Sequence, residues 1–261
     1  MSCRCSTLGR CSSRALLIAT TPNASLRVVD TVEGMSRSFA NSVVAIVGAS
    51  GGLGTQFVEQ LRAEGAQLLL AGPHPERLTP LCGPGDVVVP LDLRDARAGD
   101  TLAGVATELG RLDGVINAAG VVAFGGLAEL DDVILEELFL IDVLGPLWLT
   151  KRVAPLLSAS NGWLVHISGV IAESPLPNMA AYSAAKAAIS AANRALHREL
   201  RRQNIFVCDA RPPHTETGLA TRALAGTAPR FPHGAQPSAV VARILQGVRD
   251  GVPELAGVDF V

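Results

Sequence analysis

Two side chains able to carry and stabilise a proton lie four positions apart in an alanine-rich stretch that runs from Tyr182 to Lys186. Residues at this spacing project from the same face of a helix. A nearby ammonium group stabilises a phenolate, so we predict that Lys186 lowers the pKa of Tyr182 from about 10 toward working pH. Tyr182, the only tyrosine of the chain, could then act as a general acid or base. A solvent-exposed pair on an ordinary helix is the plainer interpretation, so the surrounding elements must decide.

A glycine-rich turn follows the first apolar stretch of this part of the chain. Residues 43–47 run directly into Gly48-Ala49-Ser50-Gly51-Gly52-Leu53-Gly54, where a helical pattern begins. Glycines let the backbone approach a pyrophosphate, and the free N–H groups at a helix N-terminus stabilise its charge. Strand, turn and helix together predict a dinucleotide site.

The same turn, at residues 48–52, also satisfies Gly-x-Ser-x-Gly, the nucleophile elbow of α/β-hydrolases. The downstream histidines His197, His214 and His233 leave a catalytic triad open. However, an elbow normally follows several strands, whereas this turn follows the first one, and no oxyanion-loop pattern precedes it. The dinucleotide site is the better interpretation.

The elements that would position these groups alternate along the chain. Apolar strands are predicted at residues 43–47, 68–70, 87–89, 115–116, 164–167 and 205–207. Helical patterns lie at residues 53–64, 99–109, 130–157 with an interruption at Gly145-Pro146, 180–202 and 238–250. This alternation predicts an α/β fold, a Rossmann-like doubly wound parallel sheet in a single domain.

Composition narrows the possible functions. With 48% hydrophobic and 18% charged residues among 261, the chain is expected to bury one large core. A net charge of −2 offers no basic field for nucleic acid, and no apolar run reaches the roughly 20 residues of a membrane span. An odd number of cysteines indicates a reducing cytoplasm, and the spacing of the first three does not predict a metal site; the five are Cys3, Cys5, Cys11, Cys82 and Cys208.

Residues 1–40 differ from the rest of the chain. They are rich in Ser, Thr and Arg, and no acidic residue precedes Asp30. We expect a poorly ordered N-terminal extension here, followed by a dinucleotide-binding domain at residues 41–261. The extension is either a targeting segment or, as we prefer, a stretch upstream of a working start at Met35.

In the order of its landmarks, the chain resembles the short-chain dehydrogenase/reductase family. The glycine turn at 48–54, Asp92-Leu93, Asn117-Ala118-Ala119-Gly120 and the Tyr182/Lys186 pair follow that family's order, over about residues 42–250. The resemblance implies an enzyme that transfers a hydride between NAD(P)(H) and a carbonyl or alcohol substrate. Tyr182 would exchange a proton with the substrate oxygen, and Lys186 would assist it and bind the nicotinamide ribose.

The resemblance also implies which residues bind the cofactor. Asp92 would lie beside the adenine ring, and Thr217 would contact the carboxamide. The implied set is Gly48, Ser50, Gly51, Gly52, Leu53, Gly54, Asp92, Leu93, Asn117, Ala118, Ala119, Gly120, Tyr182, Lys186, Pro212 and Thr217.

Three positions depart from the family pattern. Gly169 stands where a catalytic serine is expected, and Ser168 is the candidate replacement, although neighbours along a strand face opposite sides unless the backbone bulges. Asp142 stands where the family has a catalytic asparagine and is retained as a candidate. Pro213 replaces a glycine on the nicotinamide side.

The choice between NAD and NADP follows from the end of the second strand. NAD-preferring relatives carry an acidic residue where Gly72 stands, and the basic positions of NADP-preferring relatives hold Gly51 and Pro73. His74 or Arg77 could meet a 2′-phosphate, which gives NADP a slight preference.

Two functions stay open: an active oxidoreductase, or a catalytically weak NAD(P)-binding sensor or scaffold. Gly169 and Asp142 favour the second, and the Tyr182/Lys186 pair favours the first. Residues 217–237 contain several apolar side chains and predict a largely apolar substrate pocket. The resemblance implies a homodimer or homotetramer.

Overall fold

Seven parallel strands form one sheet in the order β3-β2-β1-β4-β5-β6-β7. The computed structural model describes residues 37–260. The strands are β1 (Val43–Val47), β2 (Gln67–Gly72), β3 (Val87–Pro90), β4 (Gly114–Asn117), β5 (Trp163–Ile167), β6 (Phe206–Ala210) and β7 (Glu254–Leu255). All six predicted strands are confirmed, as is the Rossmann-like doubly wound sheet; the short β7 was not predicted.

Seven α-helices connect and flank these strands within the described residues. They are α1 (Gly52–Ala63), α2 (Pro75–Leu78), α3 (Ala98–Glu108), α4 (Asp132–Phe139), α5 (Gly145–Ser160), α6 (Ala180–Leu200) and α7 (Pro237–Arg249). The predicted helices are confirmed to within about two residues, except that the predicted 130–157 helix is divided. The single turn α2 was not predicted.

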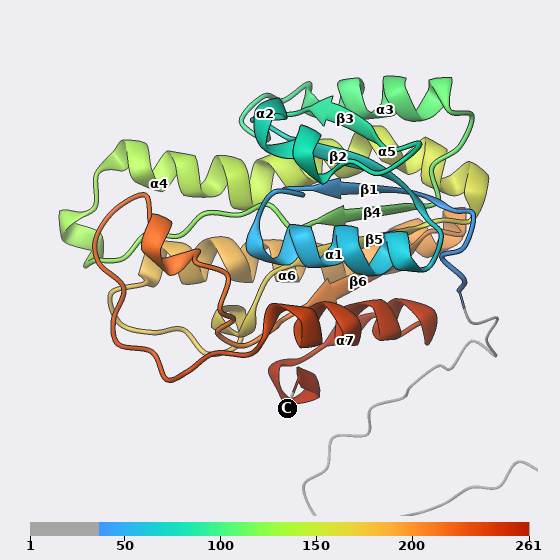
Figure 1. The fold of residues 1–261 in the computed structure, drawn as a ribbon. Helices are drawn as coiled ribbons and strands as arrows, with labels where there is room; N and C mark the ends of the chain where they lie inside the picture. Colours follow the sequence, from blue (N-terminus) through green and yellow to red (C-terminus); the bar gives the residue numbers. More distant parts are fainter. Residues whose placement is uncertain (1–36, 261) are drawn as a thin grey trace, which may run out of the picture. The chain divides into compact units, whose positions relative to one another are not determined.

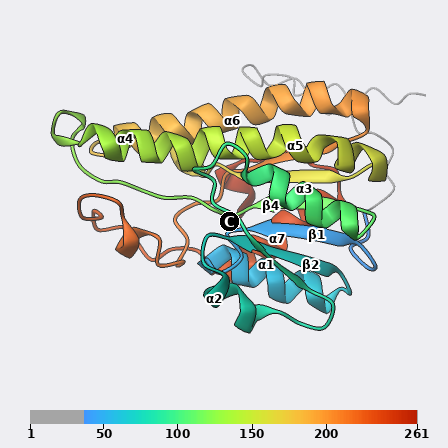
Figure 2. The same ribbon diagram turned by 90° about the horizontal axis from the view of Figure 1, so that it is seen from above.

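The helices cover both faces of the sheet (Figures 1 and 2). On one face, apolar side chains of α1 and α7, such as Phe57 and Ile244, share a buried core with β1 and β2. On the other face, α3 and α5 contribute Leu102, Leu149 and Val153 to a second core. All five residues of β1 are buried, which is why the strand appears in the sequence as a continuous apolar run.

The site lies where the strand order reverses. β1 pairs with β2 on one side and with β4 on the other, so that Val47 is in register with both Ala71 and Asn117. In doubly wound sheets, ligands bind at the carboxyl ends of the strands at this switch point. The glycine turn after β1 and the segment that follows Asn117 therefore lie side by side at the carboxyl edge of the sheet.

A π-helical turn at Leu140–Leu144 separates α4 from α5. The Gly145 N–H donates to the Leu140 carbonyl, five residues earlier. Pro146 has no N–H for the carbonyl four residues before it, and a Cβ at Gly145 would lie 2.5 Å from the Leu93 carbonyl oxygen. The predicted interruption thus brings the helix close to Leu93, with Asp142 inside the π turn.

The domain core reaches residues before the expected boundary at 41. Phe39 is buried and packs against Trp163 at a ring-centroid distance of 5.4 Å. Residues 1–36 lie outside the described residues, and with them Cys3, Cys5, Cys11 and Met35. Within residues 37–260, no helix has both the length and the hydrophobicity that a membrane crossing needs.

Candidate active site

The turn after β1 accepts only glycine at two positions. Gly48 has a φ of +81°, and a Cβ there would lie 2.6 Å from the Ala119 nitrogen. A Cβ at Gly54 would overlap the Gly48 carbonyl oxygen. The turn is therefore tightly wound against the segment after β4, with backbone rather than side chains at its surface.

The N-terminus of α1 is left open for an anion. Its N-cap residue is Gly51, no side chain caps the helix, and no acidic residue lies in its first turn. The unpaired N–H groups and positive dipole of such a terminus stabilise a phosphate. Ser50, Gly51, Gly52 and Leu53 are all exposed or partly exposed here, so the turn fits the pyrophosphate of a dinucleotide.

Two distant segments meet this turn. A Cβ at Gly52 would lie 2.7 Å from the Thr217 Cβ, which places the segment after β6 directly against α1. On the other side, the Ala118 N–H donates to the Val47 carbonyl at 2.9 Å. The buried Asn117 accepts a 3.3 Å hydrogen bond from the Ala119 N–H through its Oδ1 atom.

Asp92 and Leu93 lie just beyond the end of β3. The Asp92 carboxylate accepts hydrogen bonds from the Arg94 backbone and guanidinium, the shortest at 2.7 Å. The hydrogen bond from Arg94 lowers the pKa of Asp92. Leu93 is buried beneath the π turn.

Tyr182 and Lys186 lie one turn apart on α6. The Lys186 Nζ is 5.7 Å from the Tyr182 ring centroid and donates to the Ile167 carbonyl at 3.2 Å. Tyr182 is half-buried and packs in an apolar cluster with Val122 and Met179. The pair is therefore not on a solvent-exposed helix face.

Asp142 completes this group from the π turn. Its Oδ2 lies 3.5 Å from the Lys186 Nζ, and its Oδ1 accepts a 3.0 Å hydrogen bond from the Val121 N–H. Both side chains are buried: the Lys186 side chain is 7% exposed, and that of Asp142 is not exposed. A carboxylate and an ammonium thus share one desolvated position beside the tyrosine.

The predicted lowering of the tyrosine pKa is wrong. Burial raises the pKa of Tyr182; Lys186 opposes this rise, but Asp142 adds to it. Burial alone would lower the pKa of Lys186, yet Asp142 and Tyr182 raise it overall. The sequence prediction for Tyr182 considered the cation and left out the burial of the tyrosine and the effect of the Asp142 charge on it.

Comparison with known proteins agrees with this geometry. The family model described as "short chain dehydrogenase" matches residues 42–227 of the chain. The chain belongs to the short chain dehydrogenase family. The interpretation of the glycine turn as a hydrolase nucleophile elbow is therefore wrong.

Relatives of this family member come from animals, plants and bacteria. A bovine protein named "Dehydrogenase/reductase SDR family member 7B" is 30% identical over 73% of the chain and 63% of its own length. A Sesamum indicum protein named "11-beta-hydroxysteroid dehydrogenase A" is 34% identical over 59% of the chain and 47% of its own length. The chain thus matches less than two thirds of either relative. The crystal structure of a Streptomyces avermitilis short-chain dehydrogenase superposes with a TM-score of 0.76 at 26% identity, covering 85% of this chain and 91% of that one.

In this short chain dehydrogenase, the Ser168 side chain is directed to Asp209 of β6. Its hydroxyl is buried and donates to the Asp209 carboxylate at 2.6 Å. The N–H groups of Ser168 and Gly169 both donate to the Ala210 carbonyl, so the backbone does bulge, but Gly169 takes up the distortion with a φ of +97°. The candidate role of Ser168 as a replacement serine is thereby corrected: its hydroxyl is already committed to a buried carboxylate.

Pro212 and Pro213 lie beside this bulge. The Pro212 carbonyl accepts a 2.9 Å hydrogen bond from the Val170 N–H, and the Pro213 carbonyl accepts one of 2.8 Å from the Thr215 hydroxyl. The two prolines thus direct the chain from β6 to Thr217, which lies against the glycine turn.

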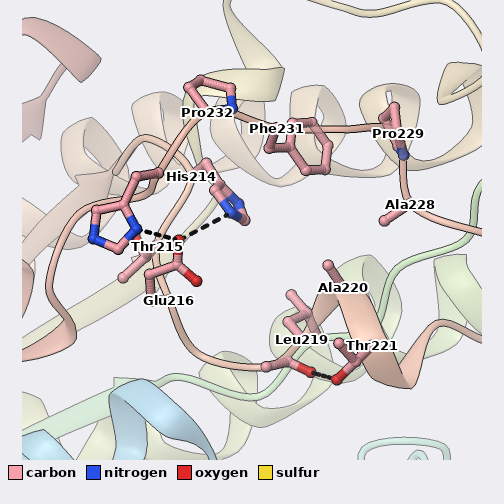
Figure 3. A pocket seen from close by; sticks show the side chains of 12 residues that line it. His214, Thr215, Glu216, Leu219, Ala220, Thr221, Ala228, Pro229, Phe231 and Pro232 are labelled. Atoms are coloured by element: carbon pink, nitrogen blue, oxygen red, sulfur yellow. Dashed lines mark hydrogen bonds and ion pairs between the residues drawn. The ribbon is translucent and has the colours of Figure 1, made fainter.

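A pocket of about 470 Å³ opens within the segment that follows (Figure 3). Its apolar side holds Leu219, Ala220 and Phe231, which belong to the same cluster as Tyr182. Its polar side holds Glu216, which lies between two imidazoles, 3.7 Å from His214 and 3.5 Å from His233. The His214 and Phe231 rings stack at 4.7 Å.

Two polar groups near the site were missed from the sequence. Glu216 is one, because its partner His233 follows seventeen positions later in an irregular segment without a periodic pattern. The other is a buried cluster around Asp209, whose carboxylate also accepts hydrogen bonds from Ser190, Asn193 and Arg211 at 2.7–3.0 Å. The alternation of Asp209 and Arg211 at the end of an apolar strand was the available signal.

Proposed function

We propose that this chain is an NAD(P)-dependent oxidoreductase that transfers a hydride between a nicotinamide cofactor and a carbonyl or alcohol substrate. The observation that carries the proposal is the Tyr182/Lys186 pair, held 5.7 Å apart (Nζ to ring centroid), with Lys186 beside Gly120 in the segment that packs against the glycine turn. A glycine turn alone would fit any dinucleotide, whereas a tyrosine beside a buried ammonium adds a means of moving a proton.

Tyr182 acts as the general acid and base in this proposal. In the reductive direction its hydroxyl donates a proton to the substrate oxygen, and in the oxidative direction its phenolate removes one. Lys186 stabilises the phenolate electrostatically and is kept in place by the Ile167 carbonyl. When bound, the nicotinamide supplies or accepts the hydride.

The cofactor would lie along the residues that border the crevice. Gly52 and Leu53 would offer backbone N–H groups to the pyrophosphate, and Gly51, whose N–H donates to the Gly48 carbonyl at 3.0 Å, would lie beside it. Asp92 and Leu93 would border the adenine side. The remaining proposed contacts are Gly48, Ser50, Gly54, Asn117, Ala118, Ala119, Gly120, Pro212, Thr217, Tyr182 and Lys186.

For the cofactor we propose a slight preference for NADP. β2 ends at the buried Gly72 without a carboxylate that would repel a 2′-phosphate. His74, with a side chain 55% exposed, and the exposed Arg77 follow this strand. Arg77→Glu should raise the KM for NADPH several-fold while leaving that for NADH unchanged, and equal effects on both would argue against a 2′-phosphate contact.

The substrate we propose is largely apolar. Phe124, Leu219 and Phe231 belong to the same apolar cluster as Tyr182. A relative whose name includes hydroxysteroid dehydrogenase supports a bulky apolar alcohol or ketone. A cytoplasmic location and a homodimer or homotetramer stay proposals that rest on the sequence and the family.

A second candidate function is a catalytically weak cofactor-binding sensor or scaffold. The observation that favours it is Gly169, which leaves no hydroxyl at the serine position while Ser168 donates to Asp209. A single donor to a developing oxyanion can contribute about 3 kcal/mol of transition-state stabilisation, so its loss would slow turnover strongly.

One experiment separates the two functions. Nicotinamide absorbance is followed with purified protein, NADPH or NADH, and a panel of apolar ketones, aldehydes and the corresponding alcohols, beside a direct titration of cofactor binding. Turnover with any member of the panel supports the oxidoreductase. Tight cofactor binding without turnover across the panel supports the sensor, and absence of cofactor binding contradicts both.

A further inference from the structure

Asp142 forms a buried ion pair with Lys186. The hydrogen bond that Asp142 accepts from the backbone requires an acceptor oxygen but not a negative charge. The Val121 N–H already engages the Asp142 Oδ1 atom, and a neutral amide could accept that hydrogen bond equally well. The Oδ2 atom is buried and has no hydrogen-bond partner among the described residues; it lies 3.5 Å from the Lys186 Nζ. Its compensation is therefore the lysine charge itself.

The other ionisable groups around Lys186 come from three elements. Tyr182 lies on its own helix, Asp209 on β6 and His166 on β5. Asp209 is engaged by four donors, namely Ser168, Ser190, Asn193 and Arg211. Asp142 is thus the carboxylate whose charge is not already matched by other groups.

We propose that Asp142 is a positioning residue that holds Lys186 in a buried ion pair and weakens the stabilisation that Lys186 gives to the Tyr182 phenolate. For its effect on turnover this inference rests on the proposed function, but its effect on Tyr182 ionisation does not. A carboxylate beside the ammonium offsets part of the positive potential that the ammonium produces at the phenolate oxygen. Asp142 therefore shifts the proton of Tyr182 toward the bound state.

The charges support this direction. Asp142 raises the pKa of Tyr182, whereas Lys186 lowers it. Asp142 also raises the pKa of Lys186, so the lysine stays protonated despite its burial. Burial raises the pKa of Asp142 itself, and Lys186 opposes that rise. The pair thereby favours a charged lysine and gives up part of the activation of the tyrosine.

The single tyrosine of the chain allows a direct test. A pH titration of tyrosinate absorbance in the near ultraviolet reports Tyr182 alone, because the chain has one tyrosine. In Asp142→Asn, the midpoint should fall by about one pH unit, the lower end of the effect of a close charge. Circular dichroism at each pH checks that the fold persists. An unchanged or higher midpoint in a folded Asp142→Asn variant overturns the proposal.

Glu137→Gln provides the matched control. Glu137 is a partly exposed carboxylate on α4, ion-paired with Arg94 at 3.4 Å and outside the Tyr182 group. Its neutralisation removes the same charge from the same stretch of chain, and the tyrosinate midpoint should stay at the wild-type value. An equal shift in both variants would mean that net charge, rather than the ion pair, is responsible, and would overturn the proposal.

A second variant covers the case in which Asp142→Asn leaves a buried lysine that does not fold. The double variant Asp142→Asn with Lys186→Met removes both charges and buries no unpaired ion. If Asp142 offsets the effect of Lys186 on Tyr182, the tyrosinate midpoint of the double variant should stay within about half a pH unit of wild type. If Asp142 has no such effect, loss of the lysine charge should raise the midpoint by about one unit or more. The latter result overturns the proposal.

The pH dependence of turnover gives the functional readout. The tyrosine-dependent limb of kcat/KM in Asp142→Asn should move to lower pH in parallel with the titration. A protein without turnover would contradict the proposed function and leave the titration to decide this inference. Normal turnover with an unmoved titration midpoint would contradict this inference alone.

Discussion

The Ser168 hydroxyl donates a 2.6 Å hydrogen bond to the Asp209 carboxylate, across the boundary between β5 and β6. Asp209 also accepts hydrogen bonds from Ser190 and Asn193 of α6, the helix that carries Tyr182 and Lys186. It forms an ion pair with Arg211 at 2.7 Å. The carboxylate therefore fixes α6 to β6, at positions four and seven residues beyond Lys186.

Replacing this carboxylate should be costly. Asp209→Ala leaves three buried donors without their partner and removes the buried one of the three carboxylates that pair with Arg211. It should lower the free energy of unfolding by about 3–5 kcal/mol. Urea unfolding measures the loss. Glu254→Gln is the matched control, because Glu254 pairs with the same guanidinium at 3.1 Å but is 43% exposed; it should change stability by less than about 1 kcal/mol. Equal losses would contradict the anchoring role.

A serine introduced at residue 169 would supply a hydroxyl at the site but should lower the stability of the protein. Gly169 has a φ of +97° and a ψ of 158°, a conformation that costs other residues about 1–3 kcal/mol, although a Cβ would find space, 3.8 Å from the Pro212 carbonyl oxygen. We expect Gly169→Ser and Gly169→Ala to lose this stability equally. Their difference in kcat then isolates the hydroxyl, and a Gly169→Ser variant as stable as wild type would contradict the assigned backbone strain.

Replacing a glycine by alanine should have opposite effects on stability at Gly54 in the glycine turn and at Gly104 in α3. In Gly54→Ala the new methyl group overlaps the Gly48 carbonyl, so we expect a loss of about 1–3 kcal/mol and a weakened cofactor titration. Gly104→Ala lies inside α3, where a Cβ meets nothing within 4 Å, and should stabilise the protein by about 0.5–1 kcal/mol. If Gly54→Ala binds NADPH normally, the turn is not the pyrophosphate site.

Acidic pH should destabilise the protein through His166. Burial lowers the pKa of His166 to about 4 from its usual 6.5, and the neutral ring meets Asn193 at 2.7 Å and Thr150 at 3.2 Å. Between these two pH values the unfolded chain binds a proton that the folded protein does not. The stabilisation is therefore complete above pH 6.5 and falls by about 1.4 kcal/mol per pH unit, or about 3 kcal/mol in total, as pH falls to about 4.

Urea unfolding of wild type and His166→Gln between these pH values measures the contribution. The variant should lose stability less steeply as the pH falls. His233→Gln, at a side chain 80% exposed, should follow the wild-type slope. Parallel curves for wild type and His166→Gln would show that the buried ring is not responsible.

Much of this architecture could be predicted because its signals are local. Residues 43–47 form a buried central strand, and a buried parallel strand is apolar along its whole length. Gly48 and Gly54 are required by contacts within the turn itself. The four-residue spacing of Tyr182 and Lys186 is a property of one helix, and it placed both groups correctly relative to each other.

The errors concern contacts between distant segments. Whether the Ser168 hydroxyl faces Tyr182 or Asp209 depends on a one-residue bulge, which alternation along a strand does not specify. The pKa of Tyr182 depends on burial and on Asp142, forty residues earlier. The strand β7 has two residues and pairs only at Asp209 and Ala210, too short for a pattern to stand out.

The most direct test of the central claim compares turnover and cofactor binding in Tyr182→Phe. This substitution removes one hydroxyl and keeps the ring that packs against Val122 and Met179. If Tyr182 is the general acid and base, kcat should fall by about 10²–10⁴-fold while the Kd for NADPH stays within about twofold of wild type. A Tyr182→Phe variant that reduces its substrate at the wild-type rate would contradict the account.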